Sequence, residues 1–221
     1  MAEIIMRGDF VEIVFVGKLK ETGDVVDTNI QSVAKEKGVF NENSIYDPVV
    51  AAIGAGQVLP GIEKALEGKG LGSYTIEMKP EEGFGKKNPQ LIQLVPTSKF
   101  LSQDVRPIAG LRVDIDGSIG VVRTVAGGRA IVDFNHPLSG KDLVYEVTVN
   151  KIIKDDKEKL ELILKKQFGF SDAIIEVNGE EAIVKIDNDI PQEVAAQFGQ
   201  RILRMVPTFK KLSFKPKEKK E

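Results

Sequence analysis

The chain has 221 residues, enough for two or three small folding units. Hydrophobic residues make up 42% and charged residues 29%, which is typical of a soluble globular protein. The 31 Lys and Arg nearly balance the 33 Asp and Glu, and the net charge of -2 argues against a protein that mainly coats DNA or an anionic membrane. With no Cys and one His, the sequence excludes disulfides, thiolate nucleophiles, Cys-bound zinc and a multi-histidine metal centre.

The beginning of the chain does not predict a leader segment. Glu3 and Asp9 interrupt it before an apolar run of signal-peptide length develops. No later stretch reaches the roughly 18 uncharged apolar residues that a membrane helix needs. We therefore expect a cytoplasmic protein, although missing cysteines do not by themselves prove a reducing compartment.

The N-terminal part predicts short strands. Residues 9–20 place Val11, Ile13 and Phe15 on one face, and their β-branched content favours a strand. A Gly-Asp turn leads to the extended segment VVDTN, and residues 31–43 predict a helical turn followed by a surface loop.

Residues 48–80 carry the most informative pattern. A strand-like run ends at two glycines, and Pro60 stands where it can begin a helix because its missing N–H is not needed there. Apolar residues at i, i+3 and i+4 from Ile62 share one face, and Gly68 is a natural end. The alternation in SYTIEMKP then predicts a half-buried strand.

Residues 86–133 predict a small β subdomain of three or four short strands. It follows a turn-rich segment in which Phe84 lies between two glycines, as a lid residue or a loop anchor does. Asp116-Gly117 is a hairpin signal, and the sequence RAIVDF follows a Gly-Gly turn. The alternating strand VYEVTV at residues 144–149 would close a sheet.

The chain changes character after Lys154. DDKEKLELILKKQF predicts a helix with one apolar face, and residues 154–157 are compatible with a linker. Asn178-Gly179 predicts a hairpin, and a second helix begins near Pro191. The terminal KPKEKKE predicts a solvated tail.

The chemistry available to these residues is restricted. The sequence has no GxSxG motif that would supply a serine nucleophile for His136. The favoured interpretation of His136 is a loop residue whose ring holds neighbouring backbone. GAGQVLPG lacks the features of a phosphate-binding loop, and Asp114 with Asp116 lacks the register of a calcium loop. Two alternatives remain open: a binding module, or an enzyme whose reaction needs no proton transfer.

Four segments resemble the FKBP-type peptidyl-prolyl isomerases: FVGKLKETGDVVDTN, GAGQVLPGIEKALEGKGLGSY, PEEGFG and NHPLSGKDLVYEVTV. The resemblance covers about residues 5–153, and an insert before the last strand is similar to the SlyD-like subclass with an insert-in-flap domain. The long C-terminal extension resembles the long archaeal members.

The resemblance implies an α+β fold in which an antiparallel half-barrel sheet surrounds a short helix. Residues 1–85 and 134–153 would form the isomerase domain, residues 86–133 an insert-in-flap chaperone domain, and residues 154–221 a C-terminal α/β-hairpin domain. The extension carries more apolar surface than it easily buries alone, which suggests a homodimer through it.

The resemblance also implies the site. Its catalytic residues would be Phe15, Asp27, Phe84 and Tyr145, and its substrate-binding residues Val26, Val58, Leu59, Ile62 and Leu138. Short members of the family usually have Trp at the Ile62 position, Tyr at the Phe15 position and Phe at the Val26 position. This less aromatic pocket predicts weak binding of macrolide inhibitors, and the KPKEKKE end predicts no nickel site.

The implied reaction is the cis-trans isomerisation of X-Pro bonds in unfolded or proline-containing polypeptides. Rotation crosses a barrier of roughly 18–20 kcal/mol, and a planar amide is more dipolar than a twisted one. An apolar cavity therefore disfavours the ground state, and neither a cofactor nor a metal is expected. The insert would add chaperone activity. Two rivals are a non-catalytic holdase, which only captures peptides, and an assembly factor built on the C-terminal unit; neither nucleic acid nor membrane is expected as a partner.

Overall fold

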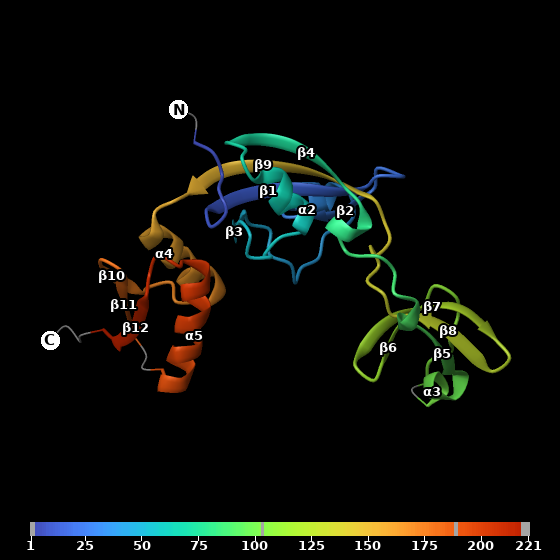
Figure 1. The fold of residues 1–221 in the computed structure, drawn as a ribbon. Coiled ribbons are helices and arrows are strands. Elements are labelled where there is room, and N and C mark those ends of the chain that lie inside the picture. Colours follow the sequence, from blue (N-terminus) through green and yellow to red (C-terminus); the bar gives the residue numbers. More distant parts are fainter. Residues whose placement is uncertain (1–2, 103, 188–189, 218–221) are drawn as a thin grey trace. The chain divides into compact units, whose positions relative to one another are not determined.

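The computed structural model describes residues 3–102, 104–187 and 190–217 (Figure 1). The chain divides into two compact units, Met1–Glu77 with Val144–Glu221, and Met78–Leu143. Sheets dominate, and short helices accompany them, so the predicted α+β class is confirmed.

The first unit contains a five-stranded sheet. Its strands are β1 (Phe10–Leu19), β2 (Val25–Thr28), β3 (Val49–Ala52), β4 (Gly72–Met78) and β9 (Leu143–Ile153). The order is β2-β1-β9-β4, and β3 also pairs with β1. On β9 the side chains of Leu143, Tyr145, Val147 and Val149 are buried and alternate with more accessible ones, as the sequence pattern predicts.

Two short helices accompany this sheet, α1 (Gln31–Glu36) and α2 (Pro60–Leu66). Helix α2 begins at Pro60 as predicted and buries Ile62 and Leu66. Gly68 follows with a φ of 78°, a left-handed conformation that glycine adopts without strain. Figure 1 shows α2 alongside the sheet.

The second unit contains a four-stranded antiparallel sheet of order β5-β8-β7-β6. Its elements are the 3-10 helices η1 (Pro80–Glu82) and η2 (Pro89–Leu91), β5 (Ile92–Pro96), α3 (Thr97–Leu101), β6 (Arg112–Ile115), β7 (Ser118–Ala126) and β8 (Arg129–Asp133). The predicted hairpin is confirmed, because Asp116 and Gly117 have φ values of 53° and 80°. The sequence did not predict α3, which buries Phe100 against Val95, Val122 and Val132.

The chain leaves the five-stranded sheet at the end of β4 and returns to it at the start of β9. These two strands are neighbours in the sheet. Lys79 and Asp142, one at each junction, form an ion pair. The second unit is thus inserted between two adjacent strands.

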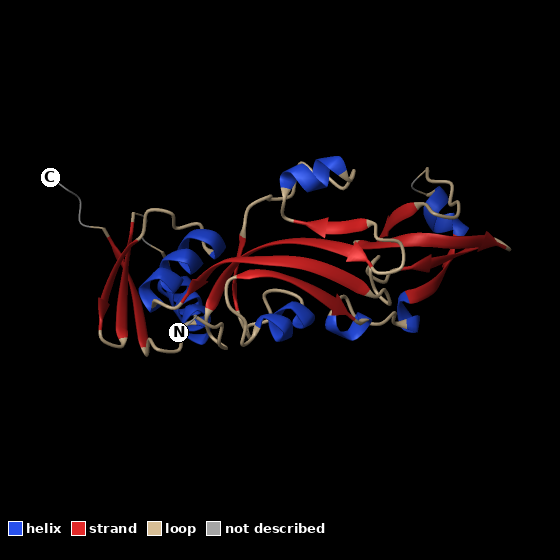
Figure 2. Ribbon diagram, turned by 90° about the horizontal axis from the view of Figure 1, so that it is seen from above, coloured by secondary structure: helices blue, strands red, loops and turns tan. Residues whose placement is uncertain are grey.

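The C-terminal extension belongs to the first unit. It comprises α4 (Asp156–Gln167), β10 (Ile174–Asn178), β11 (Glu181–Ile186), α5 (Gln192–Met205) and β12 (Lys211–Pro216). The predicted hairpin and both helices are present, but β12 adds a third strand parallel to β11. Figure 2 shows the three strands beside the helices of the extension.

Strand β12 corrects the predicted solvated tail. Lys215 and Pro216 pair with Lys185 and Ile186, and the amide of Lys217 donates to the carbonyl of Ile186 at 2.8 Å. The first part of KPKEKKE is therefore held in or beside a sheet. Residues 218–221 of the predicted tail lie outside the described residues.

The extension and the five-stranded sheet share one hydrophobic core. Phe10 and Ala52 of the sheet pack in one cluster with Leu160, Ile163 and Ile202 of α4 and α5. Residues 154–157 do not form a linker. Strand β9 ends at Ile153, and the Asp155 side chain accepts a hydrogen bond from the amide of Glu158 and so caps α4. The three-part domain division remains a prediction. Within the described ranges, no helix is long and apolar enough to cross a membrane.

Candidate functional site

Three of the predicted site residues meet on adjacent strands of the first unit. The rings of Phe15 on β1 and Tyr145 on β9 are 5.7 Å apart between centroids and tilted by 43°. The Tyr145 hydroxyl donates to Oδ2 of Asp27 on β2 at 2.7 Å. The tyrosine thus spans the intervening strand β1 and fixes the carboxylate.

Gly17 makes this crossing possible. It lies on β1 opposite Asp27, and a Cβ at this position would stand 2.5 Å from Cζ of Tyr145. No side chain larger than hydrogen fits under the ring at that distance. Local sequence carries no signal for this role of Gly17, because the contact joins residues far apart in the chain.

Tyr145 is held in its neutral form. Burial raises the pKa of its hydroxyl, and the charge of Asp27 and the hydrogen bond to it raise the pKa further, well above the ordinary value. The hydroxyl therefore remains a donor at physiological pH. In chemical terms the pair provides a fixed carboxylate beside an aromatic wall.

Thr28 and Asn29, which were also not predicted from the sequence, fix the backbone of Phe15. The Thr28 hydroxyl donates to the Phe15 carbonyl at 2.7 Å, and Asn29 Oδ1 accepts the Phe15 amide at 2.8 Å. Asn29 is buried and its Nδ2 also donates to the carbonyls of Ile13 and Asp47. The VVDTN segment, predicted only as an extended run, therefore sets the position of Phe15.

The remaining predicted residues of the first unit are apolar and lie at two places. Val26 is half-buried next to Asp27, and Val58 and Leu59 are half-buried directly before α2. Ile62 is only 2% exposed, so it contributes packing beneath the surface rather than open wall. Their assignment to a substrate pocket remains a prediction.

The other two predicted residues, Phe84 and Leu138, belong to the second unit. The Phe84 ring stacks on His136, with centroids 4.5 Å apart and an interplanar angle of 3°. Nδ1 of His136 accepts the amide of Leu138 at 3.2 Å. The ring of His136 thus holds neighbouring backbone, as the sequence favoured, and it also supports the predicted flap aromatic.

The NHPLSGK loop, residues 135–141, forms further hydrogen bonds with the segment around Phe84. The Ser139 hydroxyl donates to the Phe84 carbonyl at 3.0 Å, and the Gly140 amide donates to the Gly85 carbonyl at 2.8 Å. Asn135 exchanges hydrogen bonds with the backbone of Asn88 at 2.8 and 3.0 Å. Two segments about fifty residues apart in sequence therefore form one fixed substructure.

Asp133 anchors the start of this loop. Burial alone would raise its pKa, but hydrogen bonds from Asn135, Arg123 and Lys87 outweigh burial and hold the pKa well below its ordinary value. The Arg123 guanidinium lies 2.7 Å from Oδ2, and only 3% of the Asp133 side chain is exposed. The carboxylate joins β7, β8 and the loop that carries His136.

Comparisons with known proteins show which proteins this chain is similar to. A family model described as FKBP26, IF domain matches residues 93–138. The short-type peptidyl-prolyl cis-trans isomerase of Methanocaldococcus jannaschii is 31% identical over 159 residues, which are 72% of this chain and all of that protein. The SlyD isomerase of Pasteurella multocida is 34% identical over 137 residues, 59% of this chain and 68% of that relative.

A probable FKBP-type 16 kDa peptidyl-prolyl cis-trans isomerase of Pseudomonas fluorescens is 33% identical over 135 residues, 58% of this chain and 79% of that protein. All of these relatives are named peptidyl-prolyl cis-trans isomerases, which are enzymes. The chain belongs to the FKBP-type peptidyl-prolyl cis-trans isomerases. Its likeness to SlyD and its insert-in-flap segment, both predicted, are confirmed.

Proposed function

We propose that this chain accelerates cis-trans isomerisation of X-Pro bonds in unfolded polypeptides and so speeds proline-limited folding. The single observation that carries the proposal is the Tyr145–Asp27 pair beside Phe15, at the positions that the family resemblance assigns to the pocket wall. The half-barrel arrangement of the sheet around α2 is part of the same proposal.

The isomerisation needs no proton transfer, so the protein has only to supply an apolar environment for the rotating amide. The rotating amide loses resonance and dipole at the top of a barrier of roughly 18–20 kcal/mol. Half-buried Phe15, Val26 and Leu59 would surround it with apolar atoms, which favour the less dipolar twisted form. Asp27, held by Tyr145, would present one fixed charge at the rim. We propose that Phe84 and Leu138 contribute as the resemblance implies.

An isomerisation assay on a proline peptide tests the proposal. Asp27→Ala and Phe84→Ala should each lower kcat/KM at least about ten-fold, which corresponds to about 1.4 kcal/mol of lost transition-state stabilisation. Glu21→Gln, an exposed charge change next to β1, is the matched control and should retain the wild-type rate. Wild-type rates no higher than the uncatalysed reaction would reject the proposal and favour the non-catalytic holdase.

We also propose that the insert binds unfolded chains. Among the apolar side chains of the insert, Leu91, Ile92, Leu94 and Ile119 are exposed, whereas Val121 is half-buried and Val95 belongs to the core of the insert. Strand β5 is an edge strand, so one of its sides is open to a further strand.

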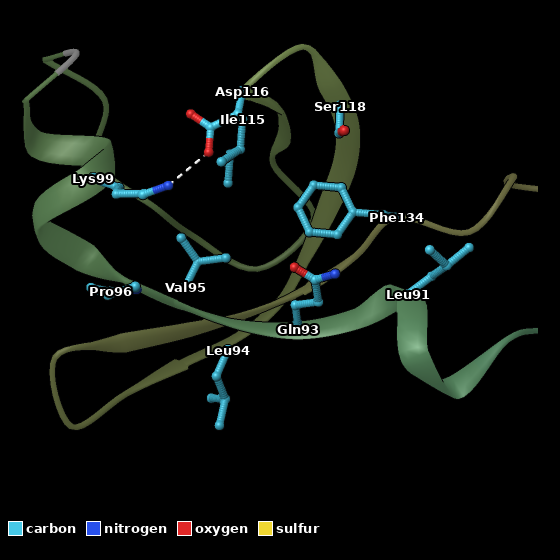
Figure 3. A pocket seen from close by; sticks show the side chains of 10 residues that line it. All are labelled: Leu91, Gln93, Leu94, Val95, Pro96, Lys99, Ile115, Asp116, Ser118 and Phe134. Atoms are coloured by element: carbon cyan, nitrogen blue, oxygen red, sulfur yellow. Dashed lines mark hydrogen bonds and ion pairs between the residues drawn. The ribbon is translucent and has the colours of Figure 1, made fainter.

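Strand β5 offers apolar surface on both faces. Leu94 is 62% exposed and lies opposite Ile131 on β8, which is 36% exposed. On the other face a hollow of about 290 Å³ lies between β5, α3 and the β6–β7 turn (Figure 3). Phe134, Val95 and Ile115 line it, and the Lys99–Asp116 ion pair closes one side. The hollow has room for one apolar side chain of a client.

Aggregation suppression tests this part. The double variant Leu94→Ser/Ile131→Ser should lose most of its ability to keep an unfolded client in solution, while its isomerisation of a short peptide stays unchanged. Leu71→Ser, which changes a comparably exposed side chain outside the insert, is the control. Unaltered aggregation suppression in the double variant would remove the insert from client binding.

The remaining expectations stay proposals. A homodimer through the extension would use the edge strand β10, where Ile174 and Val177 are exposed. Sedimentation of wild type and of Ile174→Glu would show whether the mass falls to that of one chain. A cytoplasmic location is proposed on the sequence, and cell fractionation tests it.

A further inference from the structure

A groove runs between the extension and the isomerase core, within the first compact unit. It has a volume of about 760 Å³, within the range of ligand sites in proteins. One side carries Arg201 and Arg204 of α5, and the other is the loop Ala55–Gln57. None of the residues that line it is acidic.

The positive charges of Arg201 and Arg204 are not neutralised by nearby carboxylates among the described residues. They stand three residues apart on α5, so they lie on one face and repel each other. Gln197 and Gln200 occupy the positions four residues before them, where a glutamate would neutralise them. Among the described residues, no carboxylate forms an ion pair with either guanidinium, whereas Lys185 and Lys211 of the extension pair with Glu176 and Glu181.

The groove is organised before any ligand binds. The Arg201 guanidinium lies over the Phe168 ring at 5.7 Å. Gln57 Oε1 accepts the amide of Ala52 at 2.8 Å and its Nε2 contacts Sδ of Met205 at 3.2 Å, so Gln57 joins the loop to α5. Glu63 accepts the amide of Gly56 at 2.9 Å, which commits the carboxylate of this loop region to the backbone.

We propose that this groove binds the carboxylate side chains of an acidic segment in the client polypeptide. Arginine forms planar, charge-assisted hydrogen bonds with carboxylates, and Gln57 holds the loop wall of the groove against α5. The loop continues directly into Val58 and Leu59, the predicted pocket residues, so an acidic segment held here would lie near the client's proline. The proposal rests on the proposed isomerase function and adds a sequence preference to it.

Peptide binding to the full chain tests the proposal. Two fluorescent peptides would be identical around one proline, except that one has three Asp or Glu where the other has Asn or Gln. The wild type should bind the acidic peptide about three- to ten-fold more tightly at low salt, the range expected from two exposed ion pairs, and the preference should shrink as salt rises.

The Arg201→Gln/Arg204→Gln variant should lose this preference. The matched control Lys165→Gln/Lys166→Gln removes the same charge from the neighbouring helix α4 and should keep it. An equal loss in both variants would show a general charge effect and would overturn the site. A preference that survives in the arginine variant would overturn it as well.

A charge-reversal variant distinguishes loss of the binding site from a folding defect. Arg201→Glu/Arg204→Glu should invert the preference toward a peptide with Lys in place of the acidic residues, which an unfolded protein would not do. Free glutamate should bind at least ten-fold more weakly than the acidic peptide, and equal affinities would reject a polypeptide occupant. The wild-type isomerisation rate on the neutral peptide reports separately on the proposed function, since it does not depend on the arginines' preference for acid.

Discussion

The side chain of Tyr145 depends on residues of two other strands. Its ring lies over Gly17 of β1, and its hydroxyl reaches Asp27 of β2. The family resemblance identified Phe15, Asp27 and Tyr145 by position in the motifs. The contacts between them, and the need for glycine at position 17, arise from strand order and register, which local sequence does not encode.

The first prediction concerns the ionisation of Tyr145. Burial, the charge of Asp27 and their hydrogen bond raise its pKa, so the folded protein keeps this proton as the pH rises past about 10, where an unfolded tyrosine loses it. The stability that this pKa difference contributes is complete below about pH 10 and is lost above it. In the folded protein, tyrosinate absorbance near pH 10–11 should have the same amplitude in wild type and Tyr145→Phe.

A smaller amplitude in Tyr145→Phe would show that Tyr145 ionises normally and would contradict the prediction. At neutral pH the same variant leaves the Asp27 carboxylate without its donor. It should therefore unfold about 1–3 kcal/mol more easily in urea.

The second prediction concerns Gly17. Gly17→Ala places a Cβ against the Tyr145 ring, and we expect a loss of about 1–3 kcal/mol in the free energy of unfolding together with reduced isomerisation. Gly199→Ala in α5 is the control, because its new Cβ would meet Leu212 only at 3.9 Å. That substitution should leave stability unchanged or raise it by about 0.5–1 kcal/mol. Equal effects of the two substitutions would refute the packing argument.

Among the elements, turns with specific chemistry were predictable and elements that depend on distant partners were not. Asp116-Gly117 and Asn178-Gly179 predicted their hairpins, because few residues adopt positive φ. Helix α3 is only five residues long, too short to show a helical period. Strand β12 pairs with β11 in a parallel, long-range register, which local sequence does not show, and its last two residues, Lys215 and Pro216, begin the KPKEKKE segment that suggested a tail.

The third prediction concerns the carboxylate that joins β7 and β8. The lowered pKa of Asp133 means that its stabilising contribution is complete above the unfolded value of about 3.9 and is lost as the pH falls toward the folded pKa. Asp133→Asn should be less stable than wild type at pH 7, by about 1–3 kcal/mol, with a smaller difference at pH 3.

Urea unfolding of the full chain at both pH values, followed by amide exchange in β7 and β8, measures this. Asp114→Asn on β6 makes the same chemical change at an exposed position and should not alter the midpoint at pH 7. A difference between wild type and Asp133→Asn that stays constant from pH 7 to pH 3 would argue against a charge-based contribution.

For the molecule as a whole, the extension completes the core of the isomerase sheet. Phe10 and Ala52 lie in one cluster with Leu160, Ile163 and Ile202. The change in composition near Lys154 suggested a separate unit, since sequence patterns show that a helix has an apolar face but not which surface covers it. This shared core also reduces the unburied apolar surface from which dimerisation was inferred.

The fourth prediction is that the sheet and the extension unfold together. Leu160→Ala should cost about 2–5 kcal/mol, because Leu160 is fully buried, and it should destabilise both parts. Amides of β1 and of β11 should lose hydrogen-exchange protection at the same urea concentration in wild type and variant. Ile174→Ala, at a side chain that is 51% exposed, should change little. If the amides of β11 lost protection at a lower urea concentration than those of β1, the two parts would unfold separately and the prediction would be wrong.

The junction of the insert has a consequence for how such chains can vary. β4 ends and β9 begins side by side, and Lys79 and Asp142 join the two ends. Closing a chain segment between points that already lie together costs entropy that grows only with the logarithm of its length, about 0.6 kcal/mol for each doubling. The sheet can therefore accept segments of very different size at this point, and the inserted unit can be exchanged while β4 and β9 keep their register.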